Sequence, residues 1–434
     1  MSRPERVLVL SREYPPVIVG GTATVARNLA TGLAAGGADV TVLTTGADAG
    51  AQVRERVEGV RVHRIGAGLV YNADTGLADM SLRMHRRLHA AAEALAEELG
   101  PPDLVTIPDL FCFPEASMFS SRHRVPLVNI LLQDFCAITP YDRDVHRVTN
   151  GVSAQRSHLV ALEEKAVRGS AHTVFISRAL SDAITARYPA NPMPHSVIHL
   201  GVDPAEIVSV RADPGFRRRR EEVLSATRTP SDRADRPLLV ACGRLVPVKG
   251  YEQLLHALRL VDGPAAPYGT VARPHLALVG VGPEEDRLRR LAAELGLSGR
   301  VSFLGAVPRR EALGWMSVAD VAVVPSLWES FCYVCAEMMA FGRPVVASAV
   351  DSLNELMPTD EFGYRVPVTG PLGSRVLDPA DLADALRRAL AEPAQARARG
   401  EAARRRVLET FTNDRFTEGF AALGRRLLRE RTHD

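Results

Sequence analysis

Short apolar runs alternate with longer helical patterns along the whole 434-residue chain. Each run holds only a few Val, Leu, Ile or Ala residues, which is typical of a strand buried on both faces. Strands that alternate with helices form βαβ units and parallel sheets. The runs form two series: Val7–Leu10, Val40–Leu43, Leu104–Ile107, Leu127–Leu131, Val174–Ile176 and Val197–Leu200, then Leu238–Ala241, Leu276–Val279, Val301–Leu304, Val321–Val324 and Val345–Ala347. Two series predict an α/β protein with two Rossmann-like, doubly wound parallel-sheet domains.

A polar stretch rich in arginine separates the two series. It begins at Pro204 and contains the run Arg217–Arg220, which we interpret as a solvated helix face or loop rather than a nucleic-acid site. We therefore expect a first domain over 1–204, a linker over 205–236 and a second domain over 237–411, with a long helix over 412–434. Each domain is long enough to bury a core of its own.

The composition argues against several classes of protein. The formal net charge of +2 gives no reason to expect a nucleic-acid partner, and no apolar run approaches the roughly 18 residues of a membrane span. The apolar run near the amino terminus is too short for a signal peptide, and five scattered cysteines argue against a disulfide framework. We therefore expect a cytoplasmic protein. Only Lys165 and Lys249 are lysines among 53 basic residues, which is typical of a GC-rich, actinobacterium-like genome.

Two carboxylates, Glu329 and Glu337, are separated by seven residues in the segment after the apolar run Val321–Val324. The first lies in a loop at the carboxyl end of a predicted strand, where open α/β sheets bind ligands, and the second lies on a helix expected over 331–341. Eight helical residues span roughly 12 Å at about 1.5 Å per residue. That length is of the order of the distance between the sugar and the ribose of a nucleotide sugar, so each carboxylate could accept hydrogen bonds from one of them. The phosphates would then lie over the helix amino terminus. Two solvated glutamates are the alternative for the spacing alone.

Two cations follow another predicted strand in the same way. Arg244 and Lys249 lie in the loop between the run at 238–241 and a helix that begins near Gly250. Arginine binds phosphate through two parallel hydrogen bonds, whereas lysine acts as a compact point charge. The pattern therefore predicts a diphosphate site at this edge of the second sheet, with a surface Arg and Lys beside a helix as the alternative.

Three further patterns carry less information on their own. A Gly-Gly-Thr loop at 20–22 precedes a helix, and glycine there permits close approach of the backbone to a phosphate. The G-x-G-P segment at 280–283 lacks the third glycine of a dinucleotide fingerprint, so we do not expect NAD. Cys332 and Cys335 have neither a second cysteine pair nor a histidine cluster, so we interpret them as core cysteines and expect no metal.

Together these segments resemble the retaining glycosyltransferases of the GT-B fold, specifically the glycogen-synthase-like and mannosyltransferase-like family 4. Glu329 and Glu337 match the E-x7-E signature of that family, and the Met-Ala-Phe-Gly-Arg-Pro-Val-Val run and the Asn354-Glu355 pair extend the match. The segment at 242–255 resembles the motif G-R-L-x-x-x-K-G. The resemblance covers nearly the whole chain, although its specific motifs lie in the second domain. It implies two domains that face each other across a cleft, a nucleotide-sugar donor in that cleft, and a last helix that crosses back to the first domain.

The resemblance also implies roles for individual residues. The implied reaction is a front-face substitution in which the leaving diphosphate takes the proton of the acceptor, with Arg244, Lys249 and Glu329 as catalytic residues. Glu329 would hold sugar hydroxyls and Glu337 the ribose, and no metal cofactor would be needed. The expected donor-binding residues are Gly20, Gly21, Thr22, Arg244, Lys249, Gly282, Val307, Glu329, Phe331, Cys332, Tyr333, Val334 and Glu337.

Some positions depart from the family pattern. Gln133 stands where related enzymes often carry a histidine, and a glutamine side chain can hydrogen-bond a sugar hydroxyl but cannot titrate. Cys332 replaces a usual glycine, and Asp351-Ser352 replaces the Gly-Gly pair before the last glutamate of the motif. Because that loop normally lies near the donor sugar, the identity of the sugar stays open.

The acceptor side is the least constrained part of the chain. We expect Gln133, Asp134 and Asp142 near the acceptor, because an acidic, polar stretch that also includes Asp144 and His146 suits an amine-bearing molecule such as an aminocyclitol or amino sugar. A solvated loop is the alternative. We predict a UDP-sugar such as UDP-GlcNAc or UDP-glucose as donor, and secondary metabolism, including antibiotic biosynthesis, as the setting. A nucleotide-sugar epimerase and a non-catalytic nucleotide-sugar-binding subunit are the rival hypotheses, and the oligomeric state stays open.

Overall fold

The chain folds into two compact units. The computed structural model describes residues 5–17, 21–46, 52–66, 77–138, 152–189, 193–226, 236–261 and 273–431. The first unit comprises Met1–Phe135, Val148–Leu200 and Asn413–Asp434, and the second comprises Cys136–Arg147 and Gly201–Thr412.

The first unit is built on a sheet with the strand order β3-β4-β2-β1-β5-β6-β7-β8. Neighbouring strands are parallel except β3 and β4, which form an antiparallel hairpin at one edge. The strands are β1 (Arg6–Leu10), β2 (Asp39–Gly46), β3 (Val53–Val57), β4 (Val60–Gly66), β5 (Leu104–Ile107), β6 (Leu127–Leu131), β7 (His172–Phe175) and β8 (His195–Val197). The helices are α1 (Gly21–Ala35), α2 (Leu77–Leu99), η1 (Leu110–Cys112), α3 (Phe113–His123), α4 (Phe135–Ile138), which spans the unit boundary, α6 (Val152–Gly169), α7 (Arg178–Arg187) and α17 (Asn413–Arg431).

The second unit is built on a fully parallel sheet with the strand order β11-β10-β9-β12-β13-β14. Its strands are β9 (Leu238–Cys242), β10 (His275–Val279), β11 (Val301–Gly305), β12 (Val321–Val324), β13 (Val345–Ser348) and β14 (Tyr364–Val366), with a small separate hairpin of β15 (Val368–Thr369) and β16 (Val376–Leu377). Its helices are α8 (Pro204–Arg211), α9 (Gly215–Ala226), η3 (Pro247–Lys249), α10 (Tyr251–Leu260), α11 (Glu285–Glu294), α12 (Arg309–Ser317), α13 (Tyr333–Ala340), α14 (Asp351–Leu356), η4 (Asp360–Phe362), α15 (Pro379–Ala391) and α16 (Pro393–Thr410). The winding reverses between β9 and β12, and the carboxyl ends of those two strands are where such a sheet binds ligands.

The prediction of two doubly wound parallel-sheet domains is confirmed. The pattern of apolar runs does not predict the β3–β4 hairpin, because every residue of β3 is exposed and its three central residues are charged. Glu58 and Gly59 form the turn with φ values of 49° and 83°, the backbone conformation that a two-residue hairpin requires. The pattern also misses β14, β15 and β16, which are only two or three residues long.

Two of the passages between the units, at Leu200–Gly201 and at Thr412–Asn413, are hydrogen-bonded to each other. The Val202 N–H donates to the Phe411 carbonyl oxygen at 2.9 Å, and Val202 forms a parallel bridge with Thr412. A Cβ atom at Gly201 would lie 2.1 Å from the Thr412 carbonyl carbon, so glycine permits this approach. Most of the described part of the segment expected as a linker, 205–236, forms α8 and α9 of the second unit.

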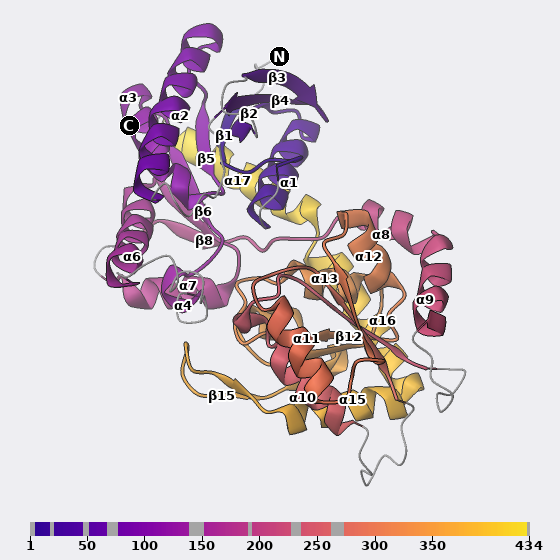
Figure 1. Ribbon diagram of the computed structural model, residues 1–434. Coiled ribbons are helices and arrows are strands. Elements are labelled where there is room, and N and C mark those ends of the chain that lie inside the picture. The colour runs from indigo at the N-terminus through magenta and orange to yellow at the C-terminus, as the bar shows by residue number, and fades with distance from the viewer. Residues whose placement is uncertain are drawn as a thin grey trace. The chain divides into compact units, whose positions relative to one another are not determined.

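The helix α17 belongs to the first unit although it follows the whole of the second in sequence. In Figure 1 this yellow helix lies beside α1. Asn28 Nδ2 donates to Asn413 Oδ1 at 3.1 Å, and Gly32 leaves room for Thr417, since a Cβ atom there would lie 2.3 Å from Thr417 Cγ2. Phe416 and Phe420 are buried on the same helix. The first unit therefore depends on residues 413–431 for part of its core.

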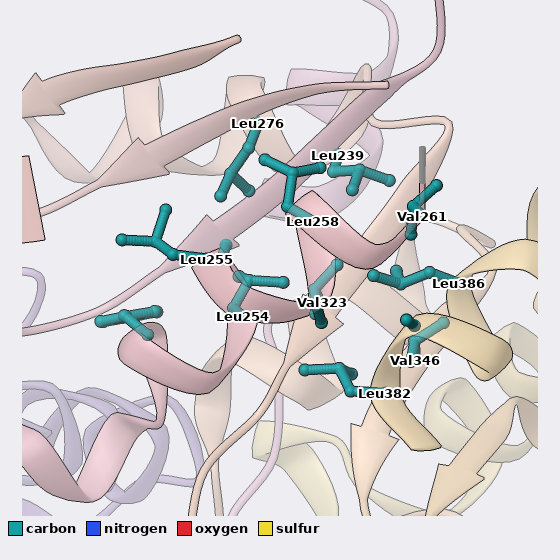
Figure 2. Close-up of a cluster of buried hydrophobic side chains, with 14 of the residues drawn as sticks. Leu239, Leu254, Leu255, Leu258, Val261, Leu276, Val323, Val346, Leu382 and Leu386 are labelled. Atoms are coloured by element: carbon teal, nitrogen blue, oxygen red, sulfur yellow. The ribbon is translucent and has the colours of Figure 1, made fainter. Parts of the chain in front are cut away.

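The core of the second unit joins its sheet to α10 and α15 (Figure 2). Leu254 and Leu258 of α10 and Leu382 of α15 lie among sheet residues such as Leu239 and Val323, and all of them are buried. Cores packed this closely deform little. The loops at the carboxyl ends of β9 and β12 therefore extend from a rigid base.

Candidate active site

The loops that follow β9 and β12 contact each other at the reversal point of the second sheet. The Leu327 N–H donates to the Val248 carbonyl oxygen at 2.7 Å. Gly250 has a φ of 68°, and a Cβ atom there would lie 1.9 Å from the Pro325 carbonyl oxygen. Glycine alone combines this backbone conformation with so close an approach. The two loops, which carry Lys249 and Glu329, are thereby fixed against each other.

Lys249 and Glu329 form an ion pair, with Lys249 Nζ 2.6 Å from Glu329 Oε1. The Ser326 hydroxyl donates to the same carboxylate oxygen at 2.7 Å. Burial opposes the charge of the ammonium, but the Glu329 carboxylate, through its charge and its hydrogen bond, and the Cys332 thiol together outweigh burial, so the pKa of Lys249 lies above its ordinary value. Lys249 therefore stays a cation at neutral pH. It contacts Glu329, the carboxylate that we expect from the sequence to bind the donor sugar.

Arg244 is exposed on the same loop, and the G-x-G-P segment supports its backbone. The Leu245 N–H donates to the Val281 carbonyl oxygen at 2.9 Å. A Cβ atom at Gly282 would lie 2.4 Å from the Leu245 carbonyl oxygen, so a side chain at 282 would displace the Arg244 loop. Gly282 therefore acts on the site by leaving room for the loop that carries the cation.

The helix α13 begins next to Glu329 with an amino terminus that no side chain caps within the described residues. Cys332 precedes it with a φ of 72°, a left-handed conformation that favours glycine, which agrees with the glycine expected there by resemblance. Phe331 is buried and its ring lies 5.5 Å from that of Tyr333 and 6.1 Å from that of Phe411. Because α13 begins at Tyr333, the N–H groups of Tyr333 and Val334 lie in its first turn, where an anion is favoured.

Glu337 lies further along α13 and is only 3% exposed. Arg309 Nη2 lies 2.9 Å from Glu337 Oε1 and also donates to Glu206 Oε2 at 2.9 Å. Burial raises the pKa of Glu337, and the Arg309 guanidinium opposes this rise. Among the described residues no hydrogen-bond donor is aligned on Glu337 Oε1. This oxygen can therefore still accept a hydrogen bond from a ligand hydroxyl.

Val307 lies between β11 and Arg309, with a half-buried side chain. Arg309 is the first residue of α12, and α12 packs against α8, which carries Glu206. Both helices are labelled in Figure 1. Sequence reasoning missed Arg309, although it follows the end of a parallel strand in the same way as Arg244. That repeated position is the signal that could have identified it.

The candidates in the first 142 residues of the chain, most of them in the first unit, are less fully described. Gly21 and Thr22 begin α1, whereas Gly20 and Asp142 lie outside the described residues. Gln133 is half-buried, and its side chain makes no hydrogen bond with another described residue. Asp134 is 1% exposed, and its Oδ2 accepts a hydrogen bond from Arg187 at 2.6 Å. Asp134 is thus held inside the unit, and the acceptor roles of these residues stay predictions.

The two cysteines of the C-x-x-C pair are buried and unbridged, and burial raises the pKa of both thiols. Cys335 Sγ lies 3.8 Å from Met339 Sδ, so it packs as a core residue. Across the part of the chain that the structure describes, no group of three or more His, Cys, Asp or Glu side chains could hold a metal ion. In the same part of the chain, no helix has the length and apolarity needed to cross a bilayer.

Each half of this chain matches a known protein family. Residues 227–406 match the family model for glycosyl transferases group 1, and residues 20–201 match that for the glycosyl transferase 4-like domain. A glycogen synthase of Mycobacterium tuberculosis is 29% identical over 94% of this chain and 91% of the relative.

Solved structures share the fold over nearly the full length. The sucrose-phosphate synthase of Thermosynechococcus elongatus matches with a TM-score of 0.76 and 23% identity over 98% of this chain and 100% of that one. A trehalose-6-phosphate structure from E. coli bound with UDP-2-fluoro glucose matches with a TM-score of 0.69 and 15% identity over 97% and 99%.

The two family matches, together with the shared fold, identify a glycosyltransferase. The chain belongs to the GT-B glycosyltransferases of family 4.

Proposed function

We propose that this protein is a retaining glycosyltransferase that moves a sugar from a UDP-sugar, such as UDP-glucose or UDP-GlcNAc, to a hydroxyl of a small-molecule acceptor. The observation that carries the proposal is the Lys249–Glu329 ion pair, set between the two loops at the reversal point and next to the uncapped start of α13. A UDP-sugar fits because the related E. coli structure binds UDP-2-fluoro glucose.

The proposed chemistry follows from these charges. The diphosphate leaves with a growing negative charge, which Lys249 and Arg244 stabilise without first reorganising. The raised pKa of Lys249 keeps its ammonium charged throughout. Glu329 holds sugar hydroxyls on the same face, and the first-turn N–H groups of α13 receive the phosphates. The leaving diphosphate takes the proton of the acceptor hydroxyl, so the acceptor attacks from the side that the leaving group vacates.

The stereochemistry of the product tests the proposal directly. We expect the new glycosidic bond to keep the anomeric configuration of the donor, because attack and departure occur on the same face of the sugar. Proton NMR of the fresh product, recorded before mutarotation of any free sugar, gives the anomeric coupling. An inverted product would exclude this mechanism while leaving the chain a glycosyltransferase.

The Glu337→Gln variant should bind UDP more weakly by about 1–2 kcal/mol, the order of the difference between a hydrogen bond to a charged group and one to a neutral group. The buried carboxylate would lose the charge that strengthens its hydrogen bond to a ribose hydroxyl. Isothermal calorimetry with free UDP measures the change. Glu252→Gln is the matched control, because Glu252 also pairs with an arginine, Arg287, at 2.6 Å but lies on α10. Equal affinities for the parent and Glu337→Gln would remove Glu337 from the ribose site.

Turnover should survive treatment with EDTA, because Arg244 and Lys249 supply the positive charge that a divalent cation would otherwise bring to the diphosphate. The measurement is the initial rate before and after chelation, then after addition of Mg²⁺ or Mn²⁺. A rate that is lost with EDTA and restored by either ion contradicts this account of the leaving group.

A panel of acceptors separates the proposal from its rivals. An epimerase converts the donor without any acceptor, and a non-catalytic subunit binds the donor without converting it. We propose an aminocyclitol or amino sugar from secondary metabolism as the acceptor to try first. Asp134 is already paired with Arg187, so recognition of an amine would depend on other groups.

A further inference from the structure

The segment that replaces the expected Gly-Gly pair makes contacts of its own. Asp351 begins α14 with a φ of 36°, in the region that favours glycine, so its side chain should bring a compensating interaction. Asp351 Oδ1 accepts a hydrogen bond from Arg375 Nη2 at 2.9 Å, and Arg375 Nη1 donates to Asp351 Oδ2. The pair is therefore bidentate, the geometry that best fixes an arginine against a carboxylate.

Arg375 also reaches the loop that carries Glu329. Its Nη1 donates to the Leu327 carbonyl oxygen at 3.0 Å. The Arg375 side chain is 18% exposed and the Asp351 side chain 19%, so water screens these contacts only in part. Arg375 comes directly before β16 of the small hairpin, so it links that hairpin, the start of α14 and the loop after β12.

Ser352 adds a second attachment to the same loop. Its hydroxyl donates to the Glu329 carbonyl oxygen at 3.2 Å. The backbone is thus held at Leu327 by Arg375 and at Glu329 by Ser352, while the Ser326 hydroxyl donates to the Glu329 carboxylate. The two residues that stand in place of Gly-Gly, together with Arg375, hold the main chain on both sides of Trp328.

We propose that Arg375 is a positioning residue of the donor site, and that it holds the 327–329 loop so that the Glu329 carboxylate stays on the donor sugar. The inference rests on the proposed function, since it assigns the sugar to Glu329. Arg375 donates to Asp351 and to the Leu327 carbonyl, and neither contact involves Glu337; the Arg244 loop is reached through the Leu327 N–H, which donates to the Val248 carbonyl oxygen. Loss of Arg375 should therefore affect the sugar end of the donor more than the ribose end at Glu337.

The test compares Arg375→Ala, Arg375→Lys and Asp351→Asn with the parent. Steady-state turnover is measured with UDP-glucose and UDP-GlcNAc, and the affinity for free UDP is measured by calorimetry. We expect kcat to fall by about 10- to 100-fold in Arg375→Ala, the range expected when a substrate contact shifts by up to about 1 Å. The affinity for UDP should fall much less than kcat. Arg375→Lys keeps a cation that reaches one acceptor at a time, so it should recover part of the loss.

Arg365→Ala is the matched control, because Arg365, like Arg375, donates to one side chain of α14 and to one backbone carbonyl. It donates to the Pro358 carbonyl oxygen and to Asn354 Oδ1, both at 2.9 Å. We expect this variant to keep the parent kcat. If Arg375→Ala also keeps it, or if Arg375→Ala and Arg365→Ala lose it equally, the inference is wrong.

Asp351→Asn separates positioning from direct contact with the substrate. If Arg375 acts through the loop, Asp351→Asn should lower kcat as well, and the double variant should lose less than the product of the two single losses. If Asp351→Asn keeps the kcat of the parent, Arg375 would instead contact the substrate directly, and the positioning role would be wrong. If the parent protein converts neither donor and does not bind UDP, the proposed function itself is wrong. That result differs from an active parent whose variants are unaffected, which would refute only the role of Arg375.

Discussion

Replacing Lys249 with arginine should lower turnover by about 100-fold. The ammonium lies 2.6 Å from Glu329 Oε1, and the next residue along the chain, Gly250, is in close contact with Pro325 of the other loop. A guanidinium is planar and larger, so it would displace either the Glu329 carboxylate or the diphosphate. A misplacement of about 1 Å can cost on the order of 100-fold in rate. Steady-state turnover of the purified variant measures the effect.

The chain supplies its own control for this substitution. Lys165, the other lysine, is exposed on α6 and should accept arginine without loss of turnover. Far-ultraviolet circular dichroism and thermal unfolding of both variants check that the fold is kept. If Lys249→Arg turns over donor as fast as Lys165→Arg, then Lys249 has no close role at the diphosphate.

Replacing Arg187 with alanine should destabilise the first unit by about 3–5 kcal/mol, the usual cost of removing one partner of a buried ion pair. Arg187 Nη1 lies 2.9 Å from Glu163 Oε1 and Nη2 lies 2.6 Å from Asp134 Oδ2. Glu163 is 0% exposed and Asp134 only 1%, so both carboxylates would stay buried without their shared cation. Arg54→Ala is the control, because its pair with Glu98 is exposed on both sides and should contribute about 1 kcal/mol at most.

The loss in Arg187→Ala should shrink as the pH falls. Burial raises the pKa of Glu163, the nearby Asp134 raises it further, and the Phe135 N–H, Arg187 and the Tyr188 hydroxyl oppose the rise. A folded-state pKa above the unfolded value means that the folded protein binds more protons between the two values, so the contribution of Glu163 to stability decreases as pH rises through that window. Without Arg187 the folded-state pKa of Glu163 rises further, so this pH window extends to higher pH. Denaturant unfolding at several pH values measures the difference from the parent, and a pH-independent difference would show that the carboxylates are not left charged.

The sequence predicts the sheets well because the buried strands are apolar on both faces. Runs such as Val321–Val324 and Leu276–Val279 have no polar residue, and both correspond to central strands covered by helices. The β3–β4 hairpin escapes this signal because it lies at an edge and exposes β3 to water. Periodicity therefore detects the inner strands of such a protein and misses the edge.

The candidate site was predictable where its residues follow strand ends along the chain. Arg244, Lys249, Glu329 and Glu337 all come after β9 or β12, and the parallel topology alone brings those ends together. Arg309 follows the end of β11 in the same way and was missed, whereas Arg375 and the partners of Asp134 could not be found in this way. Their contacts join elements far apart in sequence, so only tertiary packing shows that Asp134 is paired with Arg187 and that Arg375 reaches Leu327.

The placement of α17 has a consequence for how the protein is made. Residues 413–431 complete the core of the first unit, yet the ribosome synthesises all of Gly201–Thr412 before them. At about 5–20 residues per second, the nascent first unit waits on the order of ten seconds or more for this helix. During that time the surface of α1 that receives Thr417 is uncovered, while the second unit can already fold. The order of completion therefore runs against the order of synthesis, and a chain released before residue 413 would leave the earlier unit unfinished.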